Sequence, residues 1–108
     1  MAKTETFDEH WLDADGNPAG GVASSKGVCI SWQNGPLGRG DERREPNGGF
    51  VENVIAHVIS RLEHYQSTKF KCHENESALG HLRLAAHTLN RRTLRRDKAD
   101  IEGTHKED

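Results

Sequence analysis

An arginine-rich segment near the C-terminal end carries the most distinctive chemistry in the chain. It reads Asn90-Arg91-Arg92-Thr93-Leu94-Arg95-Arg96. On a helix, residues four apart share a face, so Arg92 and Arg96 form one row and Arg91 and Arg95 form another. Each guanidinium offers a planar fork of donors that binds phosphate oxygens bidentately. The segment therefore predicts either a phosphate-binding surface or a solvated helix end whose cations offset the helix dipole.

A glycine-rich loop is the second candidate for phosphate chemistry. The stretch from Trp32 to Gly40 holds Gly35 and Gly38 and places Arg39 close by. Backbone amides in such a loop can bind phosphate, but the pattern matches neither the Walker motif nor the dinucleotide-binding fingerprint. Residues 41–45 mix both signs of charge, which favours a solvated connector over a binding patch.

Two amphipathic helices must position these residues. Apolar side chains recur at helical spacing, which predicts one helix from about residue 49 or 50 to Gln66 and another that ends near Arg96. The connection between them is short enough to make the helices antiparallel. We expect Asn75 or Ser77 to cap the second helix and Phe70 to tuck into the end of the hairpin. The apolar positions are Val51, Val54, Ile55, Val58, Leu62, Tyr65, Ala78, Leu79, Leu82, Ala85, Ala86 and Leu89.

The N-terminal third predicts a small β element. Residues 28–32 are rich in β-formers and favour a strand with Val28, Ile30 and Trp32 on one face. Residues 13–21 have the Asp, Asn, Gly and Pro composition of turns. A second strand near His10 to Leu12 could pair with residues 28–32, and the alternative for the first twenty-odd residues is a flexible arm.

The fold class is therefore α+β and mainly α, with a long antiparallel two-helix hairpin after a small antiparallel β element. We expect a single domain over residues 1–108, made of a β and turn region (1–46), the hairpin (47–98) and a tail (99–108). The chain has 108 residues, of which 32% are hydrophobic and 30% charged, so its own core must be thin. A symmetric homo-oligomer is the expected remedy.

Composition also argues against several classes of function. The N-terminus lacks the apolar run of a signal peptide, so Cys29 and Cys72 are expected to be free thiols in the cytosol. No apolar stretch is long enough to cross a bilayer, and the net charge is only -2. Cys72 and His73 are adjacent, without the spacing of a metal site, and no nucleophile lies in a catalytic motif. We expect no metal, no cofactor and no enzymatic activity.

Several motifs occur in a fixed order along most of the chain. They are residues 16–21, 30–38, 47–55, 61–62, 65–66 and 70–75, then Ala78-Leu79, Leu82, Asn90-Arg91-Arg92-Thr93, Arg96 and Glu102-Gly103-Thr104-His105. In this order they resemble the phage Thoeris anti-defence family, first type. The helical hairpin alone is also similar to that of the phage anti-CBASS family, second type.

This resemblance implies a nucleotide sponge in the cytoplasm of the host bacterium. Such proteins bind immune signalling nucleotides, notably cyclic ADP-ribose isomers and in some members cyclic di- or trinucleotides, and hold them intact as homodimers or homohexamers. The aromatic ligand-binding position, often phenylalanine, is a tyrosine here, which keeps a stacking face and adds a hydroxyl. A small phage nucleic-acid-binding protein and a signal-degrading enzyme are the alternatives. The ligand-binding residues that the resemblance implies are Tyr65, Asn75, Arg92 and Arg96. From their chemistry and position, Thr93 is expected to join them, and the turn that holds Gly35 and Arg39 is expected to close over the ligand.

Helix geometry adds a constraint to this site. Asn75 and Arg92 are seventeen positions apart on one predicted helix, which corresponds to about 25 Å. One small nucleotide cannot contact both within a subunit. If all these side chains bind one ligand, Tyr65 and Asn75 come from one subunit and the arginines from another packed antiparallel to it. A symmetric dimer would then hold two such sites.

Overall fold

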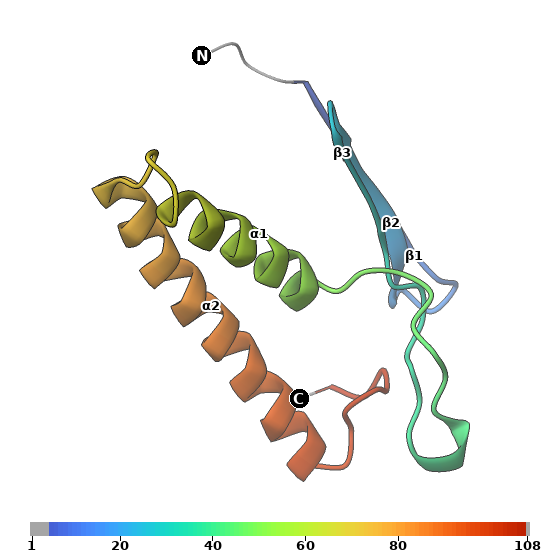
Figure 1. The fold of residues 1–108 in the computed structure, drawn as a ribbon. Coiled ribbons are helices and arrows are strands. Elements are labelled where there is room, and N and C mark those ends of the chain that lie inside the picture. The colour runs from blue at the N-terminus through green and yellow to red at the C-terminus, as the bar shows by residue number, and fades with distance from the viewer. Residues whose placement is uncertain (1–4, 108) are drawn as a thin grey trace. The chain divides into compact units, whose positions relative to one another are not determined.

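The computed structural model describes residues 5–107. Two predictions fall partly outside this range. The N-terminal stretch considered for a signal peptide includes residues 1–4, and the expected tail includes residue 108. The fold is α+β, as expected, and the chain forms two compact units. One unit comprises the chain up to Phe50 together with the segment from Ile101 onward, and the other is the helical hairpin from Val51 to Asp100. The elements are β1 (Thr6–Leu12), β2 (Pro18–Ser25), β3 (Val28–Trp32), the 3-10 helix η1 (Gly40–Glu42), α1 (Val51–Gln66) and α2 (His73–Lys98), shown in Figure 1.

The first unit is built on a three-stranded antiparallel sheet in the order β1-β2-β3. The strand predicted at residues 28–32 is confirmed, and its Val28 is exposed whereas Ile30 and Trp32 are half-buried. The predicted pairing of residues 10–12 with that strand is wrong, because both β1 and β3 pair with β2. The turn predicted at residues 13–21 is wrong from Pro18 onward, because β2 begins there although Pro and Gly are poor strand formers. The pairing partners of β2 on both sides supply the order that local propensity does not.

A long loop joins β3 to the hairpin, and its base is closed by side-chain amides. Gln33 Oε1 accepts from the backbone N–H of Asn47 at 2.8 Å, and the Asn34 N–H donates to Asn47 Oδ1 at 2.8 Å. The Asn47 amide returns a bond to the Asn34 carbonyl at 3.0 Å. Backbone bonds between Gly49 and residues 31 and 33 continue the closure. These bonds order the base of the glycine-rich loop.

The second unit is the predicted helical hairpin. Both helices are confirmed, and the two lie antiparallel with a short connection at residues 67–72 (Figure 1). The predicted cap is wrong: Cys72 is the N-cap of α2 and offers no side-chain bond, while Asn75 lies inside the first turn. The prediction for Phe70 is also wrong, because its ring is 68% exposed and lies under the ammonium of Lys69. The cap differs from the prediction because the connection is short and α2 already begins at His73, two residues before Asn75.

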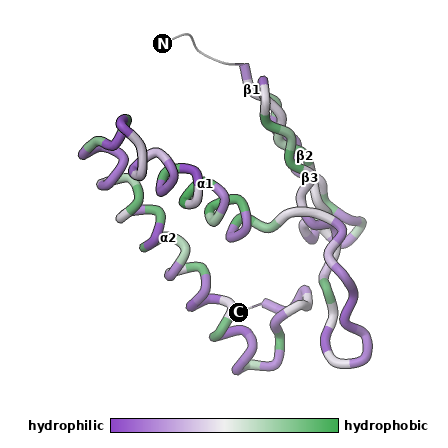
Figure 2. The backbone as a smooth tube through the Cα atoms, in the orientation of Figure 1, coloured by the Kyte–Doolittle hydropathy of each residue, from purple (hydrophilic) through white to green (hydrophobic). Residues whose placement is uncertain are grey.

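The apolar stripe of the hairpin is thin, as the composition predicts. Apolar and polar positions alternate along both helices (Figure 2), but among the described residues only Leu79 is a fully buried large side chain. Val51, Val58, Leu84 and Leu94 remain between 43% and 63% exposed. An exposed ion pair between Arg83 and Glu63, at 3.1 Å, adds a polar link between the helices. In the described residues, neither helix is both long and apolar enough to cross a membrane, and Cys29 and Cys72 are free thiols.

Candidate functional site

The closed end of the hairpin holds two of the predicted ligand-binding residues, Tyr65 and Asn75. Gln66, the residue after Tyr65, clamps the connection: its amide nitrogen donates to the Cys72 carbonyl and its amide oxygen accepts from the Cys72 N–H, both at 3.0 Å. The same nitrogen lies 3.4 Å from a carboxylate oxygen of Glu76, the residue after Asn75. The Gln66 clamp therefore ties the end of α1 to the start of α2, and sequence reasoning gave Gln66 no such role.

Tyr65 is held by a neighbour on its own helix. Arg61 lies one turn before it, with its guanidinium carbon 4.9 Å from the centre of the Tyr65 ring. Arg61 Nε also donates to the Tyr65 hydroxyl at 3.2 Å. The tyrosine is 37% exposed, so part of it remains accessible. The imidazole of His64 is tilted against the ring at a centroid distance of 6.1 Å.

One face of α2 carries predicted site residues at both of its ends. Asn75 precedes Leu79 by four and Leu82 by seven, which places it on the side of α2 that bears the apolar stripe. Thr93 and Arg96 follow Leu89 by four and seven and therefore continue the same side. Because α2 has 26 residues and α1 has 16, about 15 Å of α2 extends beyond its partner. The arginine segment lies on this extension.

The arginines differ sharply in exposure. Arg96 is only 8% exposed, whereas Arg91, Arg92 and Arg95 are exposed. The continuous helix from His73 to Lys98 keeps Asn75 and Arg92 at the separation of about 25 Å expected from the sequence. The hairpin therefore brings Tyr65 and Asn75 to one end and Arg92, Thr93 and Arg96 to the other, and does not unite the two groups within one subunit.

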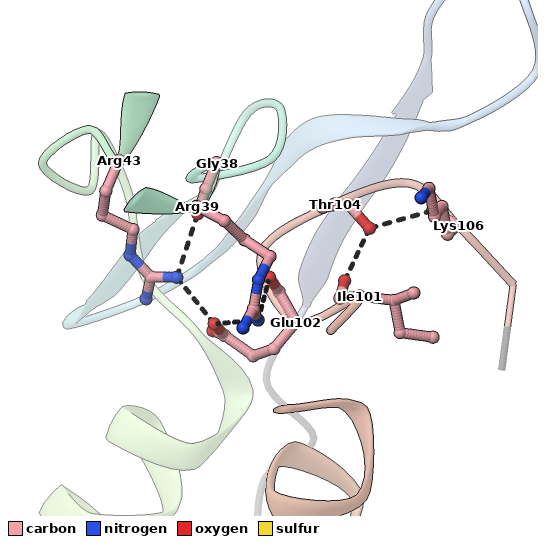
Figure 3. Close-up of polar contacts among 7 residues, drawn as sticks. All are labelled: Gly38, Arg39, Arg43, Ile101, Glu102, Thr104 and Lys106. Atoms are coloured by element: carbon pink, nitrogen blue, oxygen red, sulfur yellow. Dashed lines mark hydrogen bonds and ion pairs between the residues drawn. The ribbon is translucent and has the colours of Figure 1, made fainter. Parts of the chain in front are cut away.

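The predicted loop residues Gly35 and Arg39 belong to the first unit, and Arg39 has a partner within that unit. Figure 3 shows Arg39 and Arg43 converging on Glu102. Arg43 lies 2.7 Å from a carboxylate oxygen of Glu102, and Arg39 donates to the Glu102 backbone carbonyl at 3.0 Å. The Gly35 carbonyl accepts from the Gln33 amide at 3.2 Å. These contacts order the loop, and the proposed closure over a ligand stays a prediction.

The C-terminal segment is tied to the same loop through two glycines. The Gly38 N–H donates to the Gly103 carbonyl at 2.7 Å. Gly103 has a φ of +80°, and a Cβ there would lie 2.5 Å from the Gly38 oxygen. Thr104 then closes a turn by donating to the Ile101 carbonyl and accepting from the Lys106 N–H (Figure 3). The structure thus explains each residue type of the Glu102-Gly103-Thr104 motif: a carboxylate that pairs with arginine, a glycine with positive φ and a hydroxyl that closes a turn.

One carboxyl group has a shifted acidity. The backbone N–H of Asn17 donates to Asp13 Oδ1 at 2.9 Å and lowers the pKa of that carboxyl below its ordinary value. The N–H of Asp15 and the charge of His105 act in the same direction. Asp13 lies in the turn between β1 and β2, so this shift is structural. Among residues 5–107, no group of three or more His, Cys, Asp or Glu side chains is placed to hold a metal ion.

Comparison with known proteins matches this architecture to one family. Residues 29–94, which run from β3 through the loop and hairpin into the arginine segment, match the family model for the Acb2/Tad1 hairpin domain. The chain belongs to the Acb2/Tad1 hairpin-domain family. A curated relative, named "Thoeris anti-defense 1", from Bacillus phage SBSphiJ7, is 37% identical over 82 residues. The Thoeris anti-defence resemblance inferred from the motifs is thereby confirmed.

The match to the phage protein covers only part of each chain. It covers 76% of the chain and 55% of the phage protein, so the chain spans about half the length of its curated relative. The family model includes Tyr65, Asn75, Arg92 and Thr93 and ends before Arg96. Family membership thus rests on the hairpin that positions the predicted ligand-binding residues.

Proposed function

We propose that this chain is a phage anti-defence protein that binds and sequesters an immune signalling nucleotide in the host cytoplasm. The Acb2/Tad1 hairpin match and the name of its phage relative support the anti-defence role. Cyclic ADP-ribose isomers are the proposed ligands, with cyclic di- or trinucleotides as further candidates. Each would present a purine base to an aromatic ring and phosphates to guanidinium groups.

The separation of Asn75 from Arg92 on one unbroken helix is the observation that carries the details of the mechanism. A small nucleotide cannot span about 25 Å, so the proposed site combines the closed end of one hairpin with the arginine end of another. Tyr65 stacks on the base, Asn75 bonds to a base edge or hydroxyl, and Arg92 with Arg96 neutralises the phosphates. The assembly is a homodimer, or a homohexamer built from such dimers.

Subunit mixing tests the shared site. An Asn75→Ala chain and an Arg92→Ala chain are each expected to lose binding of cyclic ADP-ribose isomers when purified alone. After unfolding and refolding together, heterodimers regain one intact site in each pair. Calorimetry measures how many nucleotides bind per subunit, and a higher number in the mixture than in either variant alone supports the interface site. If the mixture binds no more nucleotide than the separate variants, the shared-site arrangement is wrong.

Sequestration differs from catalysis in what happens to the nucleotide. The protein is incubated with the ligand, denatured by heat, and the released nucleotide is analysed by mass spectrometry. We expect the free nucleotide to be depleted by binding before denaturation, and to be released afterwards with its mass unaltered. A changed mass after incubation would show a degrading enzyme instead. A boiled sample of the protein, added to the ligand, controls for spontaneous breakdown.

The exposed arginines of the extension also fit the alternative of a nucleic-acid-binding protein. Binding to a nucleic-acid backbone weakens steeply with salt, because neutralised phosphates release their counterions. A pocket for a cyclic nucleotide discriminates against linear duplex DNA instead. Competition of duplex DNA with labelled nucleotide, at low and high salt, separates the two functions.

A further inference from the structure

We propose that Arg61 is a positioning residue for the Tyr65 ring, a role that rests on the proposed nucleotide-binding function. In this arrangement the guanidinium covers one face of the ring and holds its hydroxyl, while the accessible part of the ring receives the purine base. Arg61 thereby acts on ligand affinity through Tyr65 and makes no contact with the phosphates.

Two independent contacts fix this arrangement. The guanidinium carbon of Arg61 lies 4.9 Å from the ring centre, within the range of a cation–π interaction. Nε of the same side chain donates to the Tyr65 hydroxyl at 3.2 Å. One contact restrains the face of the ring and the other restrains its tip. Tyrosine rather than phenylalanine at this position therefore has a physical reason, because phenylalanine offers no acceptor to Arg61.

Helix geometry brings Arg61 and Tyr65 together without a contact from another element. Arg61 and Tyr65 are four residues apart on α1, the spacing at which side chains meet on a helix surface. Gln66 clamps the end of the same helix to Cys72, so the backbone under Tyr65 is held as well. A ring with little rotational freedom loses less entropy when a base stacks on it.

The alternative role for an exposed arginine beside an aromatic ring is direct binding of a ligand phosphate. The two roles differ in how Arg61 and Tyr65 depend on each other. A residue that acts through Tyr65 contributes nothing once the ring is removed. A residue that binds phosphate directly contributes whether or not the ring is present. A double-mutant cycle separates these cases.

The test measures binding of cyclic ADP-ribose isomers by calorimetry to the full chain and to Arg61→Ala, Tyr65→Ala and the double variant. We expect Arg61→Ala to weaken binding about five- to tenfold. The double variant should bind no more weakly than Tyr65→Ala alone. Arg61→Lys, which keeps a cation but loses the Nε donor, should recover part of the affinity. Arg83→Ala is the matched control, since Arg83 is an exposed arginine of the hairpin that pairs with Glu63.

Each outcome decides the proposal. Unchanged affinity in Arg61→Ala overturns it, and so does an equal loss on removing Arg61 with and without Tyr65, which indicates direct ligand contact. A lowered melting temperature that accounts for the lost binding also counts against it. In those cases the wild-type chain still binds, so the proposed function survives. If the wild-type chain binds none of the nucleotides, the proposed function and the role of Arg61 fail together.

Discussion

A buried guanidinium sets Arg96 apart from the other arginines at its end of α2. A charged side chain with 8% exposure is stable only when its donors are satisfied. Arg92, four residues earlier in the same row of the helix surface, is exposed. The two residues were assigned one role from their sequence spacing. The burial of Arg96 indicates that it also stabilises the protein, whereas the exposed Arg92 is expected to act mainly on a ligand.

Alanine substitutions should separate these two roles. Arg92→Ala is expected to weaken binding of cyclic ADP-ribose isomers by about 2 to 5 kcal/mol, the cost of removing one partner of a buried charge pair in a complex. Its free energy of unfolding should stay within about 0.5 kcal/mol of wild type. Arg96→Ala should lose binding and also about 1 to 3 kcal/mol of unfolding free energy.

Calorimetry and urea denaturation provide the two measurements. Arg91→Ala, an exposed change one residue away, is the control for general loss of positive charge. If Arg92→Ala binds as tightly as wild type, its assignment to the ligand is wrong. If Arg96→Ala unfolds at the wild-type urea concentration, its burial has no energetic importance.

Asp13 provides a pH-dependent prediction at the same scale. The N–H of Asn17 stabilises the charged carboxylate, so the pKa of Asp13 is lower in the folded chain than in the unfolded one. Its contribution to folding is complete above the ordinary pKa of an aspartate. That contribution disappears as the pH falls through the lowered folded value. The turn between β1 and β2 should therefore loosen only when the pH falls below the ordinary pKa of an aspartate.

Amide NMR signals of Asp15 and Asn17 report this titration directly. Both should shift with a common midpoint below the ordinary pKa of an aspartate, because both donate to Asp13 Oδ1 at 2.9 Å. Asp13→Asn keeps an oxygen acceptor without the charge and should remove the transition. A midpoint at or above the ordinary value would contradict the prediction.

At the scale of elements, the Gln66 clamp explains how a six-residue connection orders two helices. Its single amide satisfies both the N–H and the carbonyl of Cys72, the N-cap residue directly before α2. Cys72 itself provides no side-chain cap to α2. The Gln66 clamp thus replaces, from the end of α1, part of what a local capping residue supplies elsewhere.

Removing the Gln66 clamp should destabilise the hairpin. Gln66→Ala leaves two half-buried backbone groups without their partner and is expected to cost about 1 to 3 kcal/mol of unfolding free energy. Lys71→Ala, an exposed change in the same connection, should cost little. Thermal unfolding followed by circular dichroism measures both. Equal melting temperatures for the two variants would show that the Gln66 clamp does not hold the connection.

The elements also show what the sequence could predict. Both helices follow from apolar spacing, because a period of 3.6 residues is a strong local signal. β2 could not be predicted in the same way, since the order of Gly21, Ser24 and Ser25 comes from strands on either side. The start of α2 after Cys72 is supported by Gln66, which acts across the connection. Contacts distant in sequence leave no local pattern to read.

In the candidate site, too, the features with a local sequence pattern could be predicted and those set by other contacts could not. The arginine row and the residues at the closed end were accessible from helical spacing and from family motifs. The pairing of Arg61 with Tyr65 fits a spacing of four, yet that spacing alone does not distinguish stacking from a solvated arginine. Arg39 and Arg43 lie about sixty positions before Glu102, so nothing local indicated that they meet.

For the whole molecule, the thin core supports the proposal that the hairpin buries apolar surface against another copy. Leu79 is the one large apolar side chain fully buried in the described residues, and Leu84 and Leu94 are more than half exposed. Gly80, four residues before Leu84, has open space where a Cβ would lie, so nothing within the chain requires a glycine there. An antiparallel partner hairpin would cover such a face.

Self-association should therefore be coupled to stability. The melting temperature is expected to rise with protein concentration, because mass action favours the folded oligomer over unfolded chains. Leu84→Glu places a charge on the exposed apolar face and should weaken association at least tenfold. Ser60→Glu makes the same change in charge at an exposed position of α1 and should leave association unchanged. Sedimentation velocity measures the assembly, and a wild-type chain that sediments as a monomer at every concentration would exclude both the oligomer and the shared site.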